Sequence, residues 1–462
     1  MKYLQVNLLI VIFFGFKTVF AQDKVLPQPY PLVSANIEKY SKMSKNKDGD
    51  GIPILNFQGR KIYYPITISQ VALHYYSNYI ETSNASSKNE FLKLAYWLKN
   101  NFTDYGSWGG WLTNDSLEGS SYQLPDRWMS AMSQGFGLSV MIEAYALTGD
   151  EVYLNIAKKV LVSFKVSVVD GGVRSNWGTS VWYDEYPTVP EKHVLNGFIF
   201  ALAGLYDYFC FTKDNDAKQL FDQGIHSLNS HLGSFDAGFN SFYSGSPNAN
   251  QHNIASKTGG KYHDLHIAQL IWLYTVTDNN SFKSWAHKFL QYDFGDVSKY
   301  GIQPKYKSIT ASSTIDSKSH GVENLYDANW TYGTYWSSYK FPVELEVKFI
   351  RPVDGLYEFV LISTKGSIDE SEFDIEIFEE NSYQVVSKKL LGVQRHASKH
   401  HIALVHLFAL PLYFDGIEKI KLKFKTHSKK VLALRELNFH YDMSQELEGM
   451  IKKLNYKRCM DQ

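Results

Sequence analysis

The chain of 462 residues is longer than a single hydrophobic core usually supports, so we expect two or three domains. With 44% hydrophobic and 20% charged residues the composition is that of a globular protein, and the formal net charge of zero argues against a nucleic-acid-coating protein. Aromatic residues reach 15%. Either large ordinary cores or a sugar-binding groove would account for that content, because an aromatic face packs on the apolar face of a pyranose.

Residues 1–21 are predicted to be a signal peptide. Lys2 is followed by an apolar run from Leu8 to Phe16 and by a Val19-Phe20-Ala21 cleavage pattern. The run is too short for a comfortable membrane span. We therefore expect a secreted or periplasmic protein that is not an integral membrane protein after cleavage; an uncleaved signal anchor is the alternative.

Residues 22–50 form a polar segment that ends in NKDGDGIPI. Asp48 and Asp50 resemble a fragment of a calcium loop, although a plain glycine turn explains them as well, since a full loop needs more ligands. Of the two cysteines, Cys210 lies in an apolar helical stretch and is expected to be a buried free thiol, and Cys459 lies near the C-terminus. Neither predicts a disulfide framework or a cysteine-based metal site.

From 51 to 300 apolar residues recur at helical spacing, as in FLKLAYWL and VLNGFIFALAGLYDYF. Polar junctions with helix-capping residues begin at Thr82, Thr148, Thr212 and Thr277, a spacing of 64 to 66 residues. Such a repeat predicts helical hairpins that pack side by side, and a closed ring of them would be an (α/α) toroid or barrel. The loops at one end of the inner helices, including WYDEYPTVP (182–190), would carry the chemistry.

After about 305 the apolar period changes to two. FPVELEVKF, EFDIEIF and EKIKLKFK alternate apolar and charged residues, which predicts strands with one buried face. We expect an antiparallel β-sandwich of jelly-roll type from 305 to 445. Residues 446–462 are expected to be a tail, either a short polar helix or disorder.

Several stretches of the helical part, in order, resemble the catalytic domain of D-glucuronyl C5-epimerases. They are IYYPITISQVALHYYSN (62–78), GGW (109–111), SAMSQGFGLSV (130–140), WYDEYPTVP (182–190), LNGFIFALAGLYD (195–207), NSFYS with Tyr243, and NIASKTGGKYHDLHIAQLIWL (253–273). The family pattern at the fourth stretch is Trp-Tyr-Glu-Glu-Tyr-Pro, of which only the first acid is shortened here. The resemblance implies an enzyme that converts glucuronate to iduronate in heparosan or heparan chains.

The resemblance also implies the site. Glu185 and Tyr262 would flank C5, with Tyr186 and Tyr243 assisting protonation or holding the carboxylate. No cofactor and no metal is expected, and the partner is an anionic uronate-containing polysaccharide. Substrate contacts are expected from six further residues: Tyr64, Arg127, Gln134, Asn196, Lys261 and His266.

Inversion at C5 of a uronate requires a base on one face, an acid on the other, and a group that stabilises the charged carboxylate. A tyrosine can act as the base if its pKa falls from about 10. A glutamate suits the task if an apolar setting raises its pKa towards neutrality, as the aromatic neighbours of Glu185 would do.

The sequence departs from the family pattern where positive charge is expected. Tyr-Asp-Leu-Arg is replaced by Tyr-Ser-Gly-Ser at 243–246, and Arg-Trp-Asp by Gly-Gly-Lys at 259–261. Substitutes could come from Lys257, Lys261, Arg127 or Arg174. The β domain also follows the helical domain here, whereas the animal enzymes carry theirs ahead of it.

The second domain resembles a discoidin-type (coagulation factor 5/8 C-type) module through ASS (311–313), NLYDANWTYGTYWSS (324–338) and LRELNF (434–439). Such modules often bind carbohydrate or anionic polymers. The basic stretch QRHASKHH (394–401) could hold an anionic polysaccharide or be an ordinary solvated loop.

Other interpretations remain open. His263 and His266 could share a helix face and bind a metal, although no third ligand is evident, and Asp264 could simply favour a helix N-terminus. A polysaccharide lyase shares the C5 proton abstraction, and a non-catalytic glycan-binding protein would use both domains. A glycoside hydrolase would need paired carboxylates, for which the candidates are Asp126, Asp184, Glu185 and Asp264. The sequence leaves pairing with a second copy open.

Overall fold

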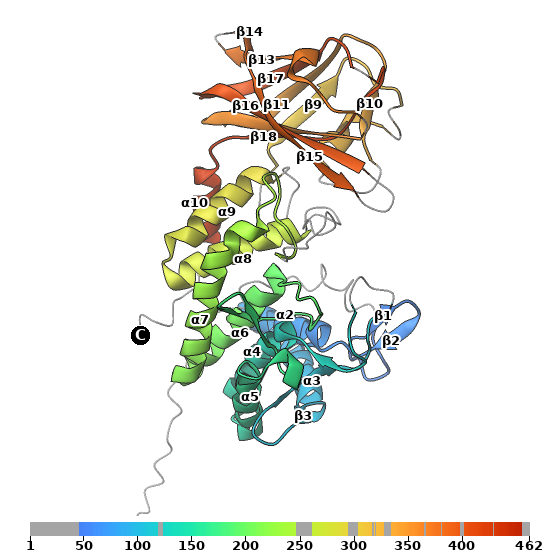
Figure 1. Cartoon of the computed structure of the whole chain (residues 1–462). Helices are drawn as coiled ribbons and strands as arrows, with labels where there is room; N and C mark the ends of the chain where they lie inside the picture. Colours follow the sequence, from blue (N-terminus) through green and yellow to red (C-terminus); the bar gives the residue numbers. More distant parts are fainter. Residues whose placement is uncertain are drawn as a thin grey trace, which may run out of the picture.

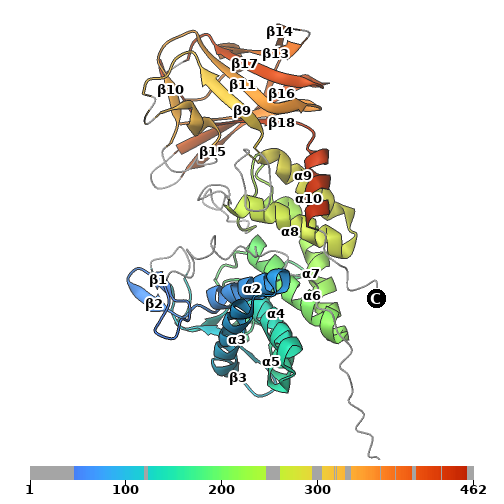
Figure 2. The ribbon, with the colours of Figure 1, turned by 180° about the vertical axis from the view of Figure 1, so that it is seen from behind.

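The computed structural model describes residues 46–454, except for 119–122, 246–260, 294–303, 317, 319, 328–333, 365, 380, 398–401 and 428. The expected signal peptide and Cys459 lie outside the described residues. A helical part and a β-sandwich stack on one another (Figure 1), and the view from behind shows the same two layers (Figure 2).

Four helical hairpins make up the helical part, as the repeat predicts. They pair α2 (Pro65–Thr82) with α3 (Ala85–Asn100), α4 (Ala131–Thr148) with α5 (Glu151–Ser163), α6 (Leu195–Thr212) with α7 (Asn215–His231), and α8 (Lys261–Thr277) with α9 (Asn280–Tyr292).

The four hairpin junctions use one hydrogen-bond pattern. Each second helix is capped by a side chain that accepts backbone N–H groups of the first turn: Asn84, Asp150, Asp214 and Asn279. The backbone N–H of each cap residue in turn donates to the hydroxyl of the threonine two residues before it, at 3.2 to 3.3 Å. The sequence repeat is therefore a repeat of capping geometry.

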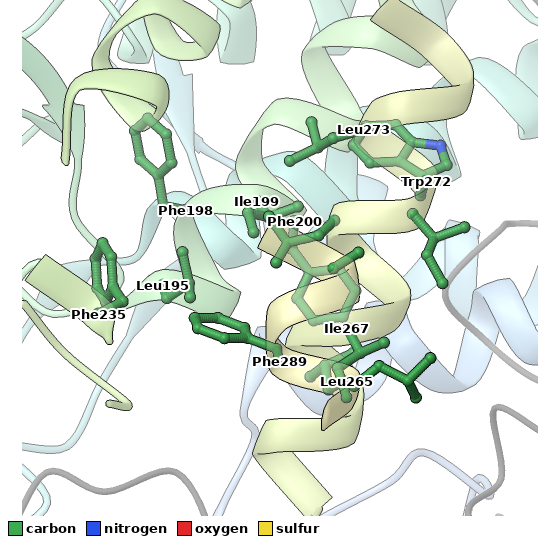
Figure 3. Packing of buried hydrophobic residues seen from close by; sticks show 14 of the residues in the cluster. Leu195, Phe198, Ile199, Phe200, Phe235, Leu265, Ile267, Trp272, Leu273 and Phe289 are labelled. Atoms are coloured by element: carbon green, nitrogen blue, oxygen red, sulfur yellow. The ribbon is translucent and has the colours of Figure 1, made fainter. Parts of the chain in front are cut away.

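The first helices of the hairpins pack on one another in chain order, α2 on α4, α4 on α6 and α6 on α8. Over the described residues this gives an arc of inner helices backed by outer ones. A Cβ on Gly204 would lie 2.1 Å from the carbonyl oxygen of Gly135, so α4 and α6 approach to backbone contact. Apolar side chains of α6, α8 and α9 fill the core beside them (Figure 3).

Short hairpins and turns precede α2 or link the later helices. They are β1 (Leu55–Phe57) with β2 (Arg60–Ile62), β3 (Thr103–Asp104) with β4 (Gly109–Gly110), β5 (Leu112–Thr113) with β6 (Trp128–Met129), and β7 (Arg174–Trp177) with β8 (Ser180–Tyr183). Two 3₁₀ turns, η1 (Val168–Asp170) and η2 (Leu232–Phe235), follow α5 and α7. At the first bend Asp48 accepts hydrogen bonds from the backbone N–H groups of Asp50 and Ile52 and from the Tyr63 hydroxyl.

The C-terminal part is an antiparallel β-sandwich of two five-stranded sheets, which confirms the expected fold class. One sheet has the order β10 (Trp336–Ser338), β18 (Leu432–His440), β12 (Leu356–Ser363), β16 (Ile402–Phe414), β15 (Lys389–Ala397). The other has the order β14 (Ser382–Val386), β13 (Phe373–Glu379), β17 (Ile417–Phe424), β11 (Val343–Val353), β9 (Tyr306–Ala311). The turns η3 (Val322–Leu325) and η4 (Glu370–Glu372) lie between strands.

The sandwich is docked on the helical part through buried polar contacts at the end of α9. The Lys305 ammonium donates to the carbonyl of Gln291 at 2.7 Å and to the Asn438 side chain at 3.1 Å. Asn438 donates to the carbonyl of Tyr292 at 3.0 Å. After β18 the chain returns as α10 (Ser444–Lys453), which packs on α8 and α9 (Figure 1).

Two findings concern α6. It is long and apolar enough to cross a membrane, but 94% of that stretch is buried inside the protein, as in the core helix of a globular fold. Cys210 on α6 is disulfide-bonded, so the expected free thiol is wrong. Helical periodicity showed the burial of this cysteine but gave no information on a distant bonding partner.

Candidate active site

The loop after β8 begins with two aromatic anchors. The ring of Trp182 stacks on Phe198 of α6 with centroids 3.7 Å apart, and the Tyr183 hydroxyl donates to the carbonyl of Leu220 at 2.9 Å. Both side chains are fully buried. The aromatic residues before the acids therefore fix the loop to α6 and α7, and the acids follow directly from a rigid strand end.

Glu185 is buried, with 4% of its surface exposed, and burial raises its pKa to about 7. A hydrogen bond from the Tyr186 side chain acts in the opposite direction, and no cation of the described chain is among the causes of the shift. One carboxylate oxygen has no hydrogen-bond partner among the described residues. Glu185 is thus poised to gain or lose a proton near neutral pH, as its aromatic setting predicted.

Gly197 makes room for this carboxylate. A Cβ at position 197 would lie 2.2 Å from a carboxylate oxygen of Glu185 and 2.7 Å from its Cβ. Because no real Cβ approaches that closely, only glycine fits at this position of the first turn of α6. Nothing in the local sequence pattern marks Gly197 as part of the site.

Tyr262 lies in the first turn of α8 and is 37% exposed. Burial of its hydroxyl and the nearby charge of Glu185 raise its pKa to about 12. A tyrosine that acts as the base would need a lowered pKa, and Tyr262 does not have one, because burial and the neighbouring Glu185 carboxylate both raise it. At neutral pH Tyr262 is a proton donor.

Tyr243 and Tyr186 complete the cluster. The ring of Tyr243 meets that of Tyr262 edge-on, with centroids 4.9 Å apart. Tyr186 bonds Glu185 and packs on Trp128 with centroids 5.6 Å apart. The structure thus brings together all four residues that the sequence placed around one sugar carbon.

The face of α8 that carries Tyr262 continues with His266 and Gln269, which follow at helical spacing. The Gln269 side chain donates to the carbonyl of Asn196 at 3.0 Å, so this face meets the start of α6. Nε2 of His266 and Oδ1 of Asn196 are buried without hydrogen-bond partners among the described residues. Asn196 directly precedes Gly197, whose position meets the Glu185 carboxylate, and His266 lies one helical turn after Tyr262, so both expected substrate-binding residues have unused polar atoms near the cluster.

Ser241 links the two histidines of α8. Its backbone N–H donates to Nδ1 of His263 at 3.1 Å, and its hydroxyl lies 2.8 Å from Nδ1 of both His263 and His266. Nε2 of His263 donates to the carbonyl of Phe289 at 2.9 Å. Burial lowers the pKa of His263 to about 4 and that of His266 well below its usual range, so both rings are neutral.

These bonds use three of the four ring nitrogens of the two histidines and leave Nε2 of His266. Among the described residues no group of three or more His, Cys, Asp or Glu side chains could hold a metal ion. Sequence reasoning missed Ser241, because its partners lie 22 and 25 positions further along the chain.

The remaining expected substrate-binding residues differ in their burial and in their hydrogen bonds. Gln134 is fully buried, and its amide bonds Trp111 and Ser130 of the backbone, so the structure gives it a supporting role. Tyr64 precedes α2 and packs near Trp128 at 6.4 Å. Arg127 is exposed and donates to the Asn114 side chain at 3.0 Å.

Of the expected cations that the structure describes, neither Arg127 nor Arg174 is among the causes of the Glu185 pKa shift. Arg174 lies on β7 opposite Tyr183 and affects the pKa of that tyrosine. Lys257 and the side chain of Lys261 lie outside the described residues. Asp184, the shortened acid of the family pattern, is buried 3.5 Å from Nδ1 of His193.

Comparison with known proteins places relatives along the helical part. Residues 100–291 match the family model described as D-glucuronyl C5-epimerase C-terminus. A D-glucuronyl C5-epimerase of Caenorhabditis elegans is 32% identical over 227 residues, which are 46% of this chain and 36% of that protein. An uncharacterized protein of Methanocaldococcus jannaschii is 34% identical over 172 residues, 36% of this chain and 53% of that protein. The resemblance expected for the helical part is confirmed, although the chain spans only about a third to a half of these relatives.

Similar solved structures include a sugar-bound module and an F5/8 type C domain. One is a family 32 CBM from C. perfringens in complex with galactose, 15% identical with a TM-score of 0.22, covering 29% of this chain and 91% of that one. Another is an F5/8 type C domain of Bacteroides fragilis, 16% identical with a TM-score of 0.23 and the same coverage.

Proposed function

We propose that the protein is a C5-epimerase that inverts D-glucuronate to L-iduronate within a heparosan-like or related uronate-containing polysaccharide. The match to D-glucuronyl C5-epimerases supports an epimerase-like activity. The observation that carries the proposal is the cluster of Glu185, with a pKa of about 7, beside the protonated phenol of Tyr262.

In the proposed reaction the Glu185 carboxylate removes the C5 proton and leaves an enediolate. The Tyr262 hydroxyl then protonates C5 from the opposite face. Because the new proton is added to the face opposite the one that lost its proton, the configuration at C5 inverts. In the reverse direction the Tyr262 phenolate, a strong base because of its high pKa, removes the proton and neutral Glu185 returns one. Tyr186, Tyr243, Asn196 and His266 would stabilise the developing charge by hydrogen bonding.

A lyase on the same site is the second candidate, because it would begin with the same proton abstraction. A non-catalytic glycan-binding protein is the third. The disulfide at Cys210 supports an exported protein, since such bonds persist in oxidising compartments. We further propose that the partner is the anionic polymer itself and that the sandwich contributes to holding it.

Incubation of the whole protein with heparosan in heavy water tests the proposal. Deuterium at C5 of an intact polymer, read by proton NMR, is the expected result. An unsaturated, ultraviolet-absorbing product would indicate the lyase, and binding without any turnover would indicate the glycan-binding protein.

The assignment of the base is tested with Glu185→Gln. A general base contributes about 10²- to 10⁴-fold, and we expect a loss of that size. Glu191→Gln, an exposed acid of the same loop, is the matched control and should keep the wild-type rate. With a pKa of about 7 for Glu185, its ionised fraction rises from about one-tenth at pH 6 to about nine-tenths at pH 8, so kcat/KM should rise about tenfold. A flat pH profile together with an active Glu185→Gln would refute this role.

A further inference from the structure

The segment 236–245 brings two residues to the site. Its Ser241 links His263 and His266, and its Tyr243 ring contacts Tyr262. The backbone carbonyl of Tyr243 also accepts a hydrogen bond from the N–H of Leu195, 3.1 Å away at the start of α6. The position of this segment therefore sets where Tyr243 and Ser241 stand relative to Tyr262 and the two histidines.

The base of the segment is fixed to the helical part. The N–H of Phe242 donates to the carbonyl of Phe235 at 2.7 Å, and Lys288 of α9 forms an ion pair with Asp236 at 2.6 Å. The tip is a tight turn in which the N–H of Ala237 bonds the carbonyl of Asn240 at 3.0 Å and Gly238 has a φ of +80°. This turn presents the Phe239 side chain outward from the helices.

Phe239 is buried by the sandwich. It is 1% exposed and forms an apolar cluster with Ala237 and with four residues of β12 and β16: Val360, Ile362, Ala403 and Val405. None of the four lies in the helical part. The tip of a site segment is thus held by a different domain.

Strands β12 and β16 carry apolar side chains on both of their faces. In the register of β12 and β16, Val360 faces Leu407 and Ile362 faces Val405, while the alternate residues Phe359 and Phe408 stack at 5.0 Å. Because side chains alternate across a strand, the first set points out of the sandwich and the second into it. An antiparallel sheet usually exposes a polar outer face, so apolar residues on both faces indicate a covered sheet.

We propose that the sandwich positions the active site, and that Phe239 is the positioning residue through which it holds Tyr243 and Ser241. This inference rests on the proposed function. The sandwich acts on the site through the segment, and no residue of it needs to touch the uronate.

A cavity of about 140 Å³ lies beside this contact, lined by Gly238, Phe239 and residues of β12, β15 and β16. It offers space into which the tip can shift when Phe239 is shortened. We therefore expect Phe239→Ala to loosen the segment rather than to leave a closed void.

The experiment compares Phe239→Ala, Phe239→Leu, Val405→Ala and the control Leu412→Ala in the full chain. Leu412 lies on the same strand as Val405 but is 68% exposed. The first readout is hydrogen exchange of the segment 236–245 by mass spectrometry, which needs no substrate. The second is kcat and KM per folded molecule, with the folded fraction taken from a thermal melt.

Phe239→Ala is expected to speed exchange in the segment and to lower kcat about 100-fold with little change in KM, because a shift of about 1 Å at a reacting group costs that much. Phe239→Leu should restore most of kcat, and Leu412→Ala should match the wild type. In a double-mutant cycle Val405→Ala should add less exchange to Phe239→Ala than to the wild type.

Unchanged exchange and unchanged kcat in folded Phe239→Ala would overturn the proposal, as would a lower melting temperature with both readouts unchanged. If the wild-type protein turns over no uronan but Phe239→Ala still loosens the segment, the proposed function fails and the positioning by the sandwich stands.

Discussion

Replacement of Gly197 by alanine is the sharpest test of the geometry around Glu185. The added Cβ would lie 2.2 Å from a carboxylate oxygen and 2.7 Å from the Cβ of Glu185. Glu185 cannot relax freely, because Trp182 and Tyr183 fix the strand end before it. The carboxylate must move by about 1 Å, which predicts a loss in kcat of about 100-fold. Overpacking should also lower the free energy of unfolding by about 1–3 kcal/mol.

The assay is the rate of deuterium uptake at C5 of the polymer, with thermal melts to determine the folded fraction. Gly449→Ala in α10 is the matched control, because a Cβ there meets nothing within 4 Å. It should be fully active and slightly more stable, since alanine favours a helix. A folded Gly197→Ala protein that exchanges at the wild-type rate would refute the placement of Glu185 at the reacting carbon.

Two further predictions concern the body of the fold. Glu143 on α4 is buried beside Asp207 of α6, and burial raises the pKa of both, that of Asp207 to about 7. The pKa values of the two carboxyls are higher in the folded protein than in the unfolded protein. The contribution of these groups to the free energy of unfolding is therefore complete at acidic pH, where both are protonated, and is lost as pH rises towards and beyond 7. In urea titrations near pH 4, Glu143→Gln should therefore have the same free energy of unfolding as the wild type. At pH 8 its free energy of unfolding should be about 1–3 kcal/mol higher. Equal values at pH 8 would contradict a buried charge at Glu143. Cys210 should resist alkylation in denatured, unreduced protein and react after reduction; labelling before reduction would show that the disulfide does not form.

Local sequence patterns were sufficient where the structure depends on neighbours along the chain. The threonine-led junctions predicted the caps of the second helices, and the alternation in FPVELEVKF predicted a strand. The aromatic run around Glu185 predicted an apolar setting, and burial raises the pKa of Glu185 to about 7. In each case the decisive contact lies within a few residues or within one element.

The patterns failed where contacts join distant segments. Burial raises the pKa of Tyr262, and the charge of Glu185, which is 77 positions away along the chain, raises it further. Ser241 meets His266 and Phe239 meets Val405 only after folding. One signal was available for the last contact: Phe359 to Ile362 is a continuous apolar run, which is typical of a strand covered on both faces.

The return of the chain from β18 into α10 places Leu447 and Met450 in buried positions against the last helical hairpin. The sandwich is therefore inserted between two pieces of one helical body, and it is joined to that body twice. During synthesis α8 and α9 remain uncovered on this side until α10 has left the ribosome. Replacing the sandwich by a different module would therefore require two junctions, one after α9 and one before α10. A single junction after α9 would remove α10 and expose the apolar surface of the last hairpin, which favours aggregation.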